Sequence, residues 1–289
     1  GNQRMKTLYL ECKMGAAGDM LMSALYELLP DQAAFLHIMN HLHEGISISM
    51  EKKDTCGIRG SHAVVDIGGK VENAEDLPCG CLHHHTELHV NAQNHNHPHD
   101  HVHDHDHESN SHRHTTPADI RRILDHLPVP EEVRTHAKAV YDRIAQAESK
   151  AHGVPVEHIH FHEVGSLDAV VDVTGVCLAM HLLHPDQVIV SPIHLGSGQV
   201  RCAHGIMPVP APATANLLIG LPCYCGEING ELCTPTGAAL LAHFANSFGP
   251  MPSLMLEKIG YGVGAKAFPS ANCVRAFYGE ANDPQQAEI

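Results

Sequence analysis

The alternation of apolar and polar residues along the chain predicts strands near both ends and helices mainly in the middle. Strict alternation is typical of a half-buried strand, whereas apolar residues three or four positions apart indicate a helix. By this criterion, strands are expected at 7–12, 46–50, 62–67, 188–190, 254–259 and 272–278. Helices are expected at 21–29, from Thr116 onward, and at 131–151, 166–183, 213–219 and 237–248.

One low-complexity segment, residues 79–115, interrupts this pattern and offers almost nothing to bury, so we expect a disordered His-rich loop. The strands before it cannot bury both faces without the helices that follow it. We therefore expect a single domain over 5–278, with 79–115 as an insert and 279–289 as a tail. Its expected class is α/β (or α+β), with a mixed sheet flanked by helices.

Composition narrows the possible partners of this 289-residue chain. Its 18 basic and 33 acidic residues give a net charge of −15, and it contains no Trp, so nucleic-acid binding is not expected. Two uncharged stretches, 202–226 and 232–256, reach membrane-spanning length, but prolines break both. The first ten residues hold no apolar signal core. We expect a cytoplasmic protein with no membrane contact, whose cysteines are free or metal-bound.

Residues 187–256 carry only three charged side chains, Arg201, Glu227 and Glu231. A region so poor in charge is expected to be mostly buried, either in the core or in an interface. An interface of this kind would make the protein a homo-oligomer.

Histidine is the compositional outlier, because 13 of the 28 histidines fall between His83 and His114. Imidazole and carboxylate ligands suit Ni, Zn, Cu or Co, and their irregular spacing favours several exchangeable ions over one tight site. A low-complexity spacer is the alternative. Cys79 and Cys81 could add a softer site, or be ordinary loop thiols. The expected ligands are His83, His84, His85, His95, His97, His99, His101, His103, His105 and His107, with Cys79 and Cys81.

The segment from His160 to Asp172 concentrates the remaining candidate chemistry. His160 and His162 lie on one side of an extended chain, and Asp168 and Asp172 share one face of a helix. Carboxylates on an apolar helix need a partner, so this group could bind a metal or supply a base beside it. The expected catalytic residues are His160, His162, Glu163, Asp168 and Asp172, with both histidines as further metal ligands. Alternatively, Glu163 and Ser166 cap the helix and Asp168 is solvated.

Two further segments could hold a ligand. The turn containing Gly15, Gly18 and Asp19 joins a strand to a helix, and could aim backbone N–H groups at an anion or simply pack closely. Arg201 is a lone cation in the charge-poor region, and His204 follows it closely; Arg in such a setting pairs with a carboxylate or a phosphate.

Together these motifs resemble one family. Gly15-Ala-Ala-Gly18-Asp19-Met20, the internal His-rich insert, His160-Phe-His162-Glu163, the His204–Thr214 segment and Thr234-Pro-Thr236-Gly237 are similar to those of the nickel insertion protein of lactate racemase maturation. The resemblance runs from about Lys6 to Tyr278.

The resemblance implies an enzyme, a nickel chelatase of the lyase class. It would insert Ni(II) into pyridinium-3,5-bisthiocarboxylic acid mononucleotide while consuming CTP, and the nickel-pincer product would serve lactate racemase. Members of the family carry a C-terminal domain associated with CTP binding, and this chain ends soon after Tyr278. We therefore expect CTP binding and full activity to require that domain. A non-enzymatic nickel or zinc storage chaperone is the alternative function, and a metal-dependent hydrolase using His160, His162 and Asp172 is a third.

Overall fold

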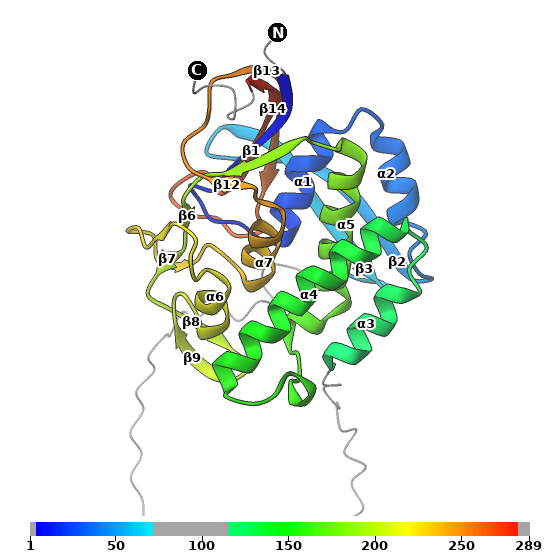
Figure 1. Ribbon diagram of the computed structural model, residues 1–289, viewed down its shortest axis with the longest axis vertical. Helices are drawn as coiled ribbons and strands as arrows, with labels where there is room; N and C mark the ends of the chain where they lie inside the picture. The colour runs from blue at the N-terminus through cyan, green and yellow to red at the C-terminus, as the bar shows by residue number, and fades with distance from the viewer. Residues whose placement is uncertain (1–3, 72–114, 283–289) are drawn as a thin grey trace, which may run out of the picture.

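Strands from both ends of the chain meet in one sheet (Figure 1). The structure is a computed structural model that describes residues 4–71 and 115–282. Within these ranges the largest sheet has eight strands, in the order β12-β5-β1-β14-β13-β3-β2 with β4 paired to β3. Their bounds are β1 Arg4–Glu11, β2 Ile46–Thr55, β3 Ile58–Ile67, β4 Lys70–Val71, β5 Gln187–Val190, β12 Ser247–Phe248, β13 Leu254–Val263 and β14 Cys273–Asn282.

The pairing of these strands is both parallel and antiparallel. β1 lies between β5, to which it is parallel, and β14, to which it is antiparallel, with Leu8 opposite Tyr278. The β2–β3 hairpin joins the same sheet where Ser61 pairs in parallel with Gly262 of β13. Elements from both sides of residues 72–114 thus build one sheet, and the predicted mixed α/β class is confirmed.

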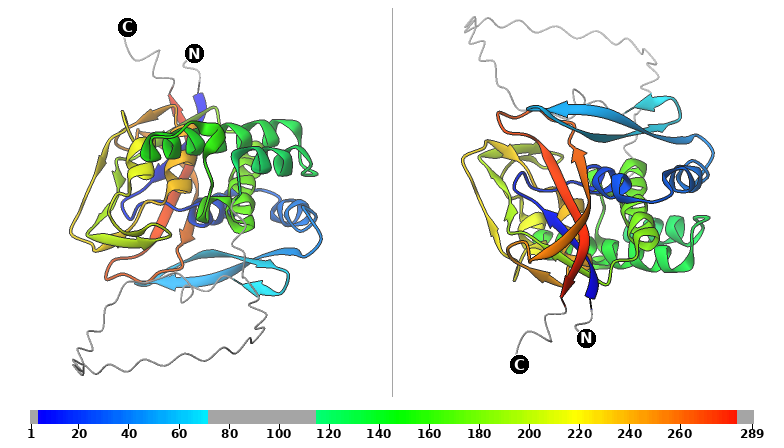
Figure 2. Two further views of the ribbon diagram at one scale, coloured as in Figure 1. Left: turned by 90° about the horizontal axis from the view of Figure 1, so that it is seen from below. Right: turned by 90° about the horizontal axis from the view of Figure 1, so that it is seen from above.

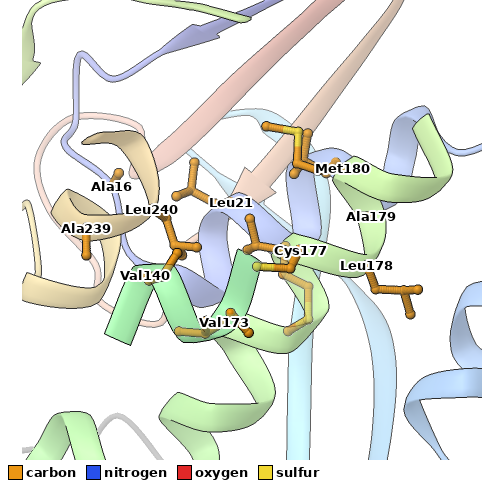
Figure 3. Packing of buried hydrophobic residues seen from close by; sticks show 14 of the residues in the cluster. Ala16, Leu21, Val140, Val173, Cys177, Leu178, Ala179, Met180, Ala239 and Leu240 are labelled. Atoms are coloured by element: carbon orange, nitrogen blue, oxygen red, sulfur yellow. The ribbon is translucent and has the colours of Figure 1, made fainter. Parts of the chain in front are cut away.

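Helices cover this sheet in two successive layers (Figure 2). Helix α1 packs against β13, β3 and β14, α5 packs beside α1, and α4 packs on α5 with α3, α6 and α7 around it. Buried residues of α1, α4, α5 and α7 converge in the core, among them Leu21, Val140, Cys177 and Leu240 (Figure 3). The helices are α1 Gly18–Leu28, α2 Gln32–Met39, α3 Pro117–Asp125, α4 Glu131–His152, α5 Leu167–Leu183, α6 Pro212–Leu217 and α7 Pro235–Phe244.

Short elements connect these layers. Two single 3-10 turns, η1 (Val156–His158) and η2 (Glu163–Gly165), lie between α4 and α5. Three two-stranded sheets follow β5 and lie apart from the main sheet. Their strands are β6 Ile193–His194, β7 Gly196–Ser197, β8 Gln199–Cys202, β9 Gly205–Pro208, β10 Cys223–Tyr224 and β11 Gly230–Glu231.

Capping residues begin three of the helices where the sequence pattern expects them. Thr116 and Asp119 form a capping box before Pro117, the first residue of α3. Ser166 accepts a hydrogen bond from the backbone N–H of Ala169, and Thr234 accepts one from Gly237. Ser166 therefore caps α5, as the alternative interpretation of the His160–Asp172 segment expected.

Several predicted boundaries are wrong. β2, β3 and β13 are each four or five residues longer than predicted, and α2 was not among the expected helices. Three further boundaries differ as follows. Helix α7 ends at Phe244, because Asn246 exchanges backbone and side-chain hydrogen bonds with Val188 and the chain continues as β12. β14 continues to Asn282, so the first residues assigned to the tail belong to the sheet. Thr115, assigned to the insert, forms a β-bridge with Phe161.

The expectation of burial for the charge-poor region is met only in part. Leu232, Cys233 and the core of α7 are buried, but Ile206, Ile219 and Met255 are exposed. Apolar side chains of this region therefore lie on the surface of the single chain. None of the helices in the described residues has the length and apolar character required to cross a membrane.

Candidate functional site

A backbone junction ties the residue that follows 72–114 to the predicted catalytic motif. Phe161 donates its backbone N–H to the carbonyl of Thr115 at 2.7 Å. Phe161 is buried, whereas His160 and His162 on either side of it are exposed. This alternation is the one expected of an extended segment, and it directs both rings away from the core. In sequence, His114 is the residue immediately before Thr115.

His162 and His204, predicted from separate motifs, are in contact. His204 lies in the turn between β8 and β9, and its ring centroid is 4.8 Å from that of His162. The ring of His152, the last residue of α4, is also 4.8 Å from that of His204. The C-terminal end of α4 and the β8–β9 hairpin lie side by side in Figure 1.

Asp172 lies on α5 against the first turn of α1. A Cβ atom placed on Gly18 would be 3.0 Å from the Cβ of Asp172 and 3.3 Å from Cγ2 of Thr236. Burial raises the pKa of the Tyr141 hydroxyl, and the charge of Asp172 raises it further. A carboxylate at the N-terminus of a helix is stabilised by the helix dipole. Burial also raises the pKa of Asp168, one turn earlier on α5.

Close packing accounts for the glycines of the first turn. Gly15 has φ +75°, and a Cβ there would lie 2.1 Å from the carbonyl oxygen of Leu232. The backbone N–H of Gly15 donates to the carbonyl of Cys12, and that of Ala16 donates to the carbonyl of Leu232. These two amides are therefore engaged within the protein, which favours packing over a phosphate cradle at this turn. A ligand role for Gly15 and Gly18 stays a prediction.

Glu163 lies near a second carboxylate that sequence analysis did not select. Burial raises the pKa of Glu231 to about 7, with Lys266 acting to lower it and Glu163 to raise it. Glu231 belongs to β11, which pairs with β7. A carboxyl group with such a pKa exists in both protonation states at neutral pH, which suits it to proton transfer.

Asp19 faces a different group, on the β2–β3 hairpin. Burial raises the pKa of Asp19, while the charges of His62 and Lys53 and a hydrogen bond from the N–H of Met20 lower it. Lys53 donates to the carbonyls of Gly264 and Ala265. Asp19 is thus held by the start of its own helix and by the neighbouring hairpin.

The remaining candidates are placed as follows. Arg201 is exposed on β8, in the same hairpin as His204. Cys12, directly after β1, is fully buried, and burial raises the pKa of its thiol to about 12. Cys79, Cys81 and the histidines between 83 and 114 lie outside the described residues.

Four charged or titratable residues near the candidate site were not predicted as part of it: Glu148, His152, Glu231 and Lys266. Glu148 and His152 have the spacing that puts two side chains on one helix face, inside the correctly predicted helix 131–151. Glu231 stood out as one of the few charges in the 187–256 region. Lys266 lies in the loop after β13 and showed no pattern. Within residues 4–71 and 115–282, no three His, Cys, Asp or Glu side chains already surround a common metal position.

The chain is similar to known proteins over nearly its whole length. The sequence model of the nickel insertion protein family matches residues 8–289. The chain belongs to this family. A relative from Desulfitobacterium hafniense, named pyridinium-3,5-bisthiocarboxylic acid mononucleotide nickel insertion protein, is 34% identical over 284 residues. That match covers 98% of this chain and 61% of the relative.

Two other members of the family with the same name are similarly close. The one from Geobacillus kaustophilus is 36% identical over 278 residues, covering 96% of this chain and 60% of the relative. The one from Staphylococcus epidermidis is 35% identical over 285 residues, covering 98% of this chain and 62% of the relative. This chain thus spans about six tenths of the length of the curated relatives it matches. No solved structure matches it.

Proposed function

We propose that this chain inserts Ni(II) into pyridinium-3,5-bisthiocarboxylic acid mononucleotide, in a CTP-dependent reaction of the lyase class. Family membership and the printed names of the relatives support the substrate. The observation that carries the proposal is the Thr115–Phe161 junction. It puts the sequence position that ends the His-rich segment beside the two exposed histidines of the motif, which would let bound nickel pass between them.

The chemistry requires three kinds of group. Ni(II) exchanges its ligands for the two sulfur atoms of the substrate and bonds to the ring carbon between them, from which a proton leaves. His160 and His162 would hold nickel before this exchange, since neutral imidazole is a good ligand for it. A carboxylate would accept the ring proton.

Two positions supply that carboxylate. Asp172 lies on α5, against the first turn of α1. Glu231, beside Glu163, has a pKa of about 7 and takes up or releases a proton at neutral pH. We assign proton transfer to these carboxylates and keep Asp168 as a neighbour that adds negative charge.

Arg201 is our candidate for the phosphate of the mononucleotide, because it is exposed on the hairpin that carries His204. No CTP contact is assigned to the described residues. The amides of Gly15 and Ala16, which could have cradled phosphates, donate to Cys12 and Leu232 instead. The product would pass to lactate racemase apoenzyme.

The second candidate function is a nickel or zinc storage chaperone, favoured by the density of ligands in the His-rich segment. The two functions are separated by incubating the protein with Ni(II) and the metal-free mononucleotide, with and without CTP and the part of the Desulfitobacterium hafniense relative that the chain does not match. Products are identified by mass. An enzyme turns over more mononucleotide than there is protein, and more with CTP. A chaperone binds nickel and leaves the mononucleotide unchanged.

A further inference from the structure

Four metal-ligating side chains from three separate elements gather at the C-terminal end of α4. Glu148 and His152 are one helical turn apart on α4, with Oε2 of Glu148 3.3 Å from Nε2 of His152. His204 comes from the β8–β9 turn and His162 from the segment after η1. The ring of His204 lies between the other two, 4.8 Å from each.

The carboxylate of Glu148 interacts with two of the three imidazole rings. Burial raises the pKa of Glu148, and the rings of His152 and His204 lower it, so the carboxylate faces both rings. Three imidazoles in a row would repel one another if all were protonated, but as neutral donors they can share a cation. Three nitrogen ligands with one carboxylate suit Ni(II) or Zn(II), and are a poor match for Mg(II) or Ca(II).

We propose that Glu148, His152, His162 and His204 form a nickel-binding site, in which Ni(II) is held on its way to the mononucleotide. This proposal rests on the proposed function, and makes His204 a metal ligand where sequence analysis assigned it to the organic substrate. The site lies beside Phe161 and hence next to the Thr115 junction.

Binding requires the side chains to turn toward a common point. In the present arrangement the rings meet edge to face, and no three ligands in residues 4–71 and 115–282 already enclose a metal position. An ion from solvent can reach these side chains, because His162 and His204 are exposed and the side chain of His152 is 37% exposed. A site that must close around its ion also releases it readily, which suits a transfer step.

The experiment uses the full chain and Ni(II) alone as the probe, with hydrogen exchange as the readout. Nickel bound by the four residues would join the β8–β9 hairpin to α4, so it should slow amide exchange at 199–207. Nickel bound only by the His-rich segment has no reason to do so. In His152→Ala and Glu148→Gln, the nickel concentration for half-maximal protection should rise at least about tenfold. His126→Ala, at the C-terminal cap of α3 and before the start of α4, is the control and should behave like the wild type.

Melting temperature checks that each variant folds, and Glu148→Gln serves if His152→Ala does not. The proposal is overturned if nickel loads the wild type without protecting 199–207, or if both variants keep full protection. Product formation is measured separately on the same samples, with CTP and the part of the Desulfitobacterium hafniense relative that the chain does not match both added. If nickel protects 199–207 but no product forms, the nickel site is supported and the insertion function is contradicted. If product forms without this protection, the insertion function is supported and the nickel site is contradicted.

Discussion

The backbone N–H of Phe161 donates to the carbonyl of Thr115 at 2.7 Å, and this bond joins segments 46 residues apart in sequence. Gly165 packs directly over the junction, because a Cβ there would lie 2.7 Å from the Cβ of Phe161 and 3.0 Å from that of Thr115. The position of His160 and His162 relative to the start of α3 therefore depends on a residue without a side chain.

Gly165→Ala should separate these two segments. The added methyl group overpacks a buried contact, so we expect a loss of about 1–3 kcal/mol in the free energy of unfolding. Nickel insertion at limiting nickel should fall by more than the unfolded fraction explains. Chemical denaturation and product formation on the same preparation measure both quantities. Full activity in a variant that is destabilised by this amount would show that the junction is not required for nickel insertion.

Removing residues 83–114 should lower the amount of nickel that the protein binds without lowering its rate of nickel insertion at saturating nickel. The number of nickel ions bound per chain should fall sharply, while the rate of insertion at saturating nickel should stay near that of the intact protein. In the intact protein, nickel loading should decrease as the pH drops below about 6.5, since imidazole binds metal only when neutral. Metal analysis after gel filtration provides the count. A deletion variant that retains its nickel would place the store elsewhere.

Asp172→Asn tests the carboxylate against the start of α1. Asn keeps the size of the side chain and loses its charge, so we expect product formation almost to vanish while bulk nickel uptake is unchanged. Asp142→Asn is the control, because Asp142 pairs with Arg121 on the surface and should cost at most about 1 kcal/mol. Product formation and melting temperature are measured together. Full activity of Asp172→Asn at the stability of the wild type would exclude Asp172 from the chemistry.

Glu231 should make the stability of the protein depend on pH in a defined direction. Its pKa is about 7 in the folded protein, against an ordinary value of 4.5, so the folded state binds more protons between these values. Its contribution is therefore fully present below pH 4.5 and is lost as the pH rises through 7. The full loss amounts to about 3 kcal/mol.

Glu231→Gln should remove that dependence and leave the variant more stable than the wild type at pH 8. Urea unfolding at several pH values between 4.5 and 8 measures the difference between the two proteins. If the two stability curves run parallel across this range, Glu231 does not titrate in it. Loss of insertion activity in the stabilised variant would support a role in proton transfer.

Local sequence patterns predicted most of the fold correctly. Alternation located β1 and the strands β2 and β3, and Thr116 located the start of α3. The helix expected from 237 begins two residues earlier, at Pro235. These features depend on neighbouring residues only. The end of α7 was missed because Asn246 bonds to Val188, a partner far away in sequence.

The sequence predicted individual residues of the candidate site but not which of them lie together. His162 and His204 were both selected, but for different roles, since nothing local indicates that their rings meet. The shifted pKa of Glu231 depends on burial and on Glu163 and Lys266, which only the tertiary structure brings near it. The packing of Gly15 on Leu232 likewise explains a motif that sequence alone left open between two interpretations.

The most direct test of nickel insertion uses a mononucleotide carrying deuterium on the ring carbon between the two thiocarboxylates. The protein is incubated with this compound, Ni(II) and CTP, alone and together with the part of the Desulfitobacterium hafniense relative that the chain does not match. The full-length relative and a protein-free mixture serve as controls, and the product is analysed by mass spectrometry. We predict a product that has gained nickel and lost the deuterium, formed over many turnovers. Nickel bound to the protein with the deuterium fully retained, under conditions in which the full-length relative releases it, would contradict the proposed function.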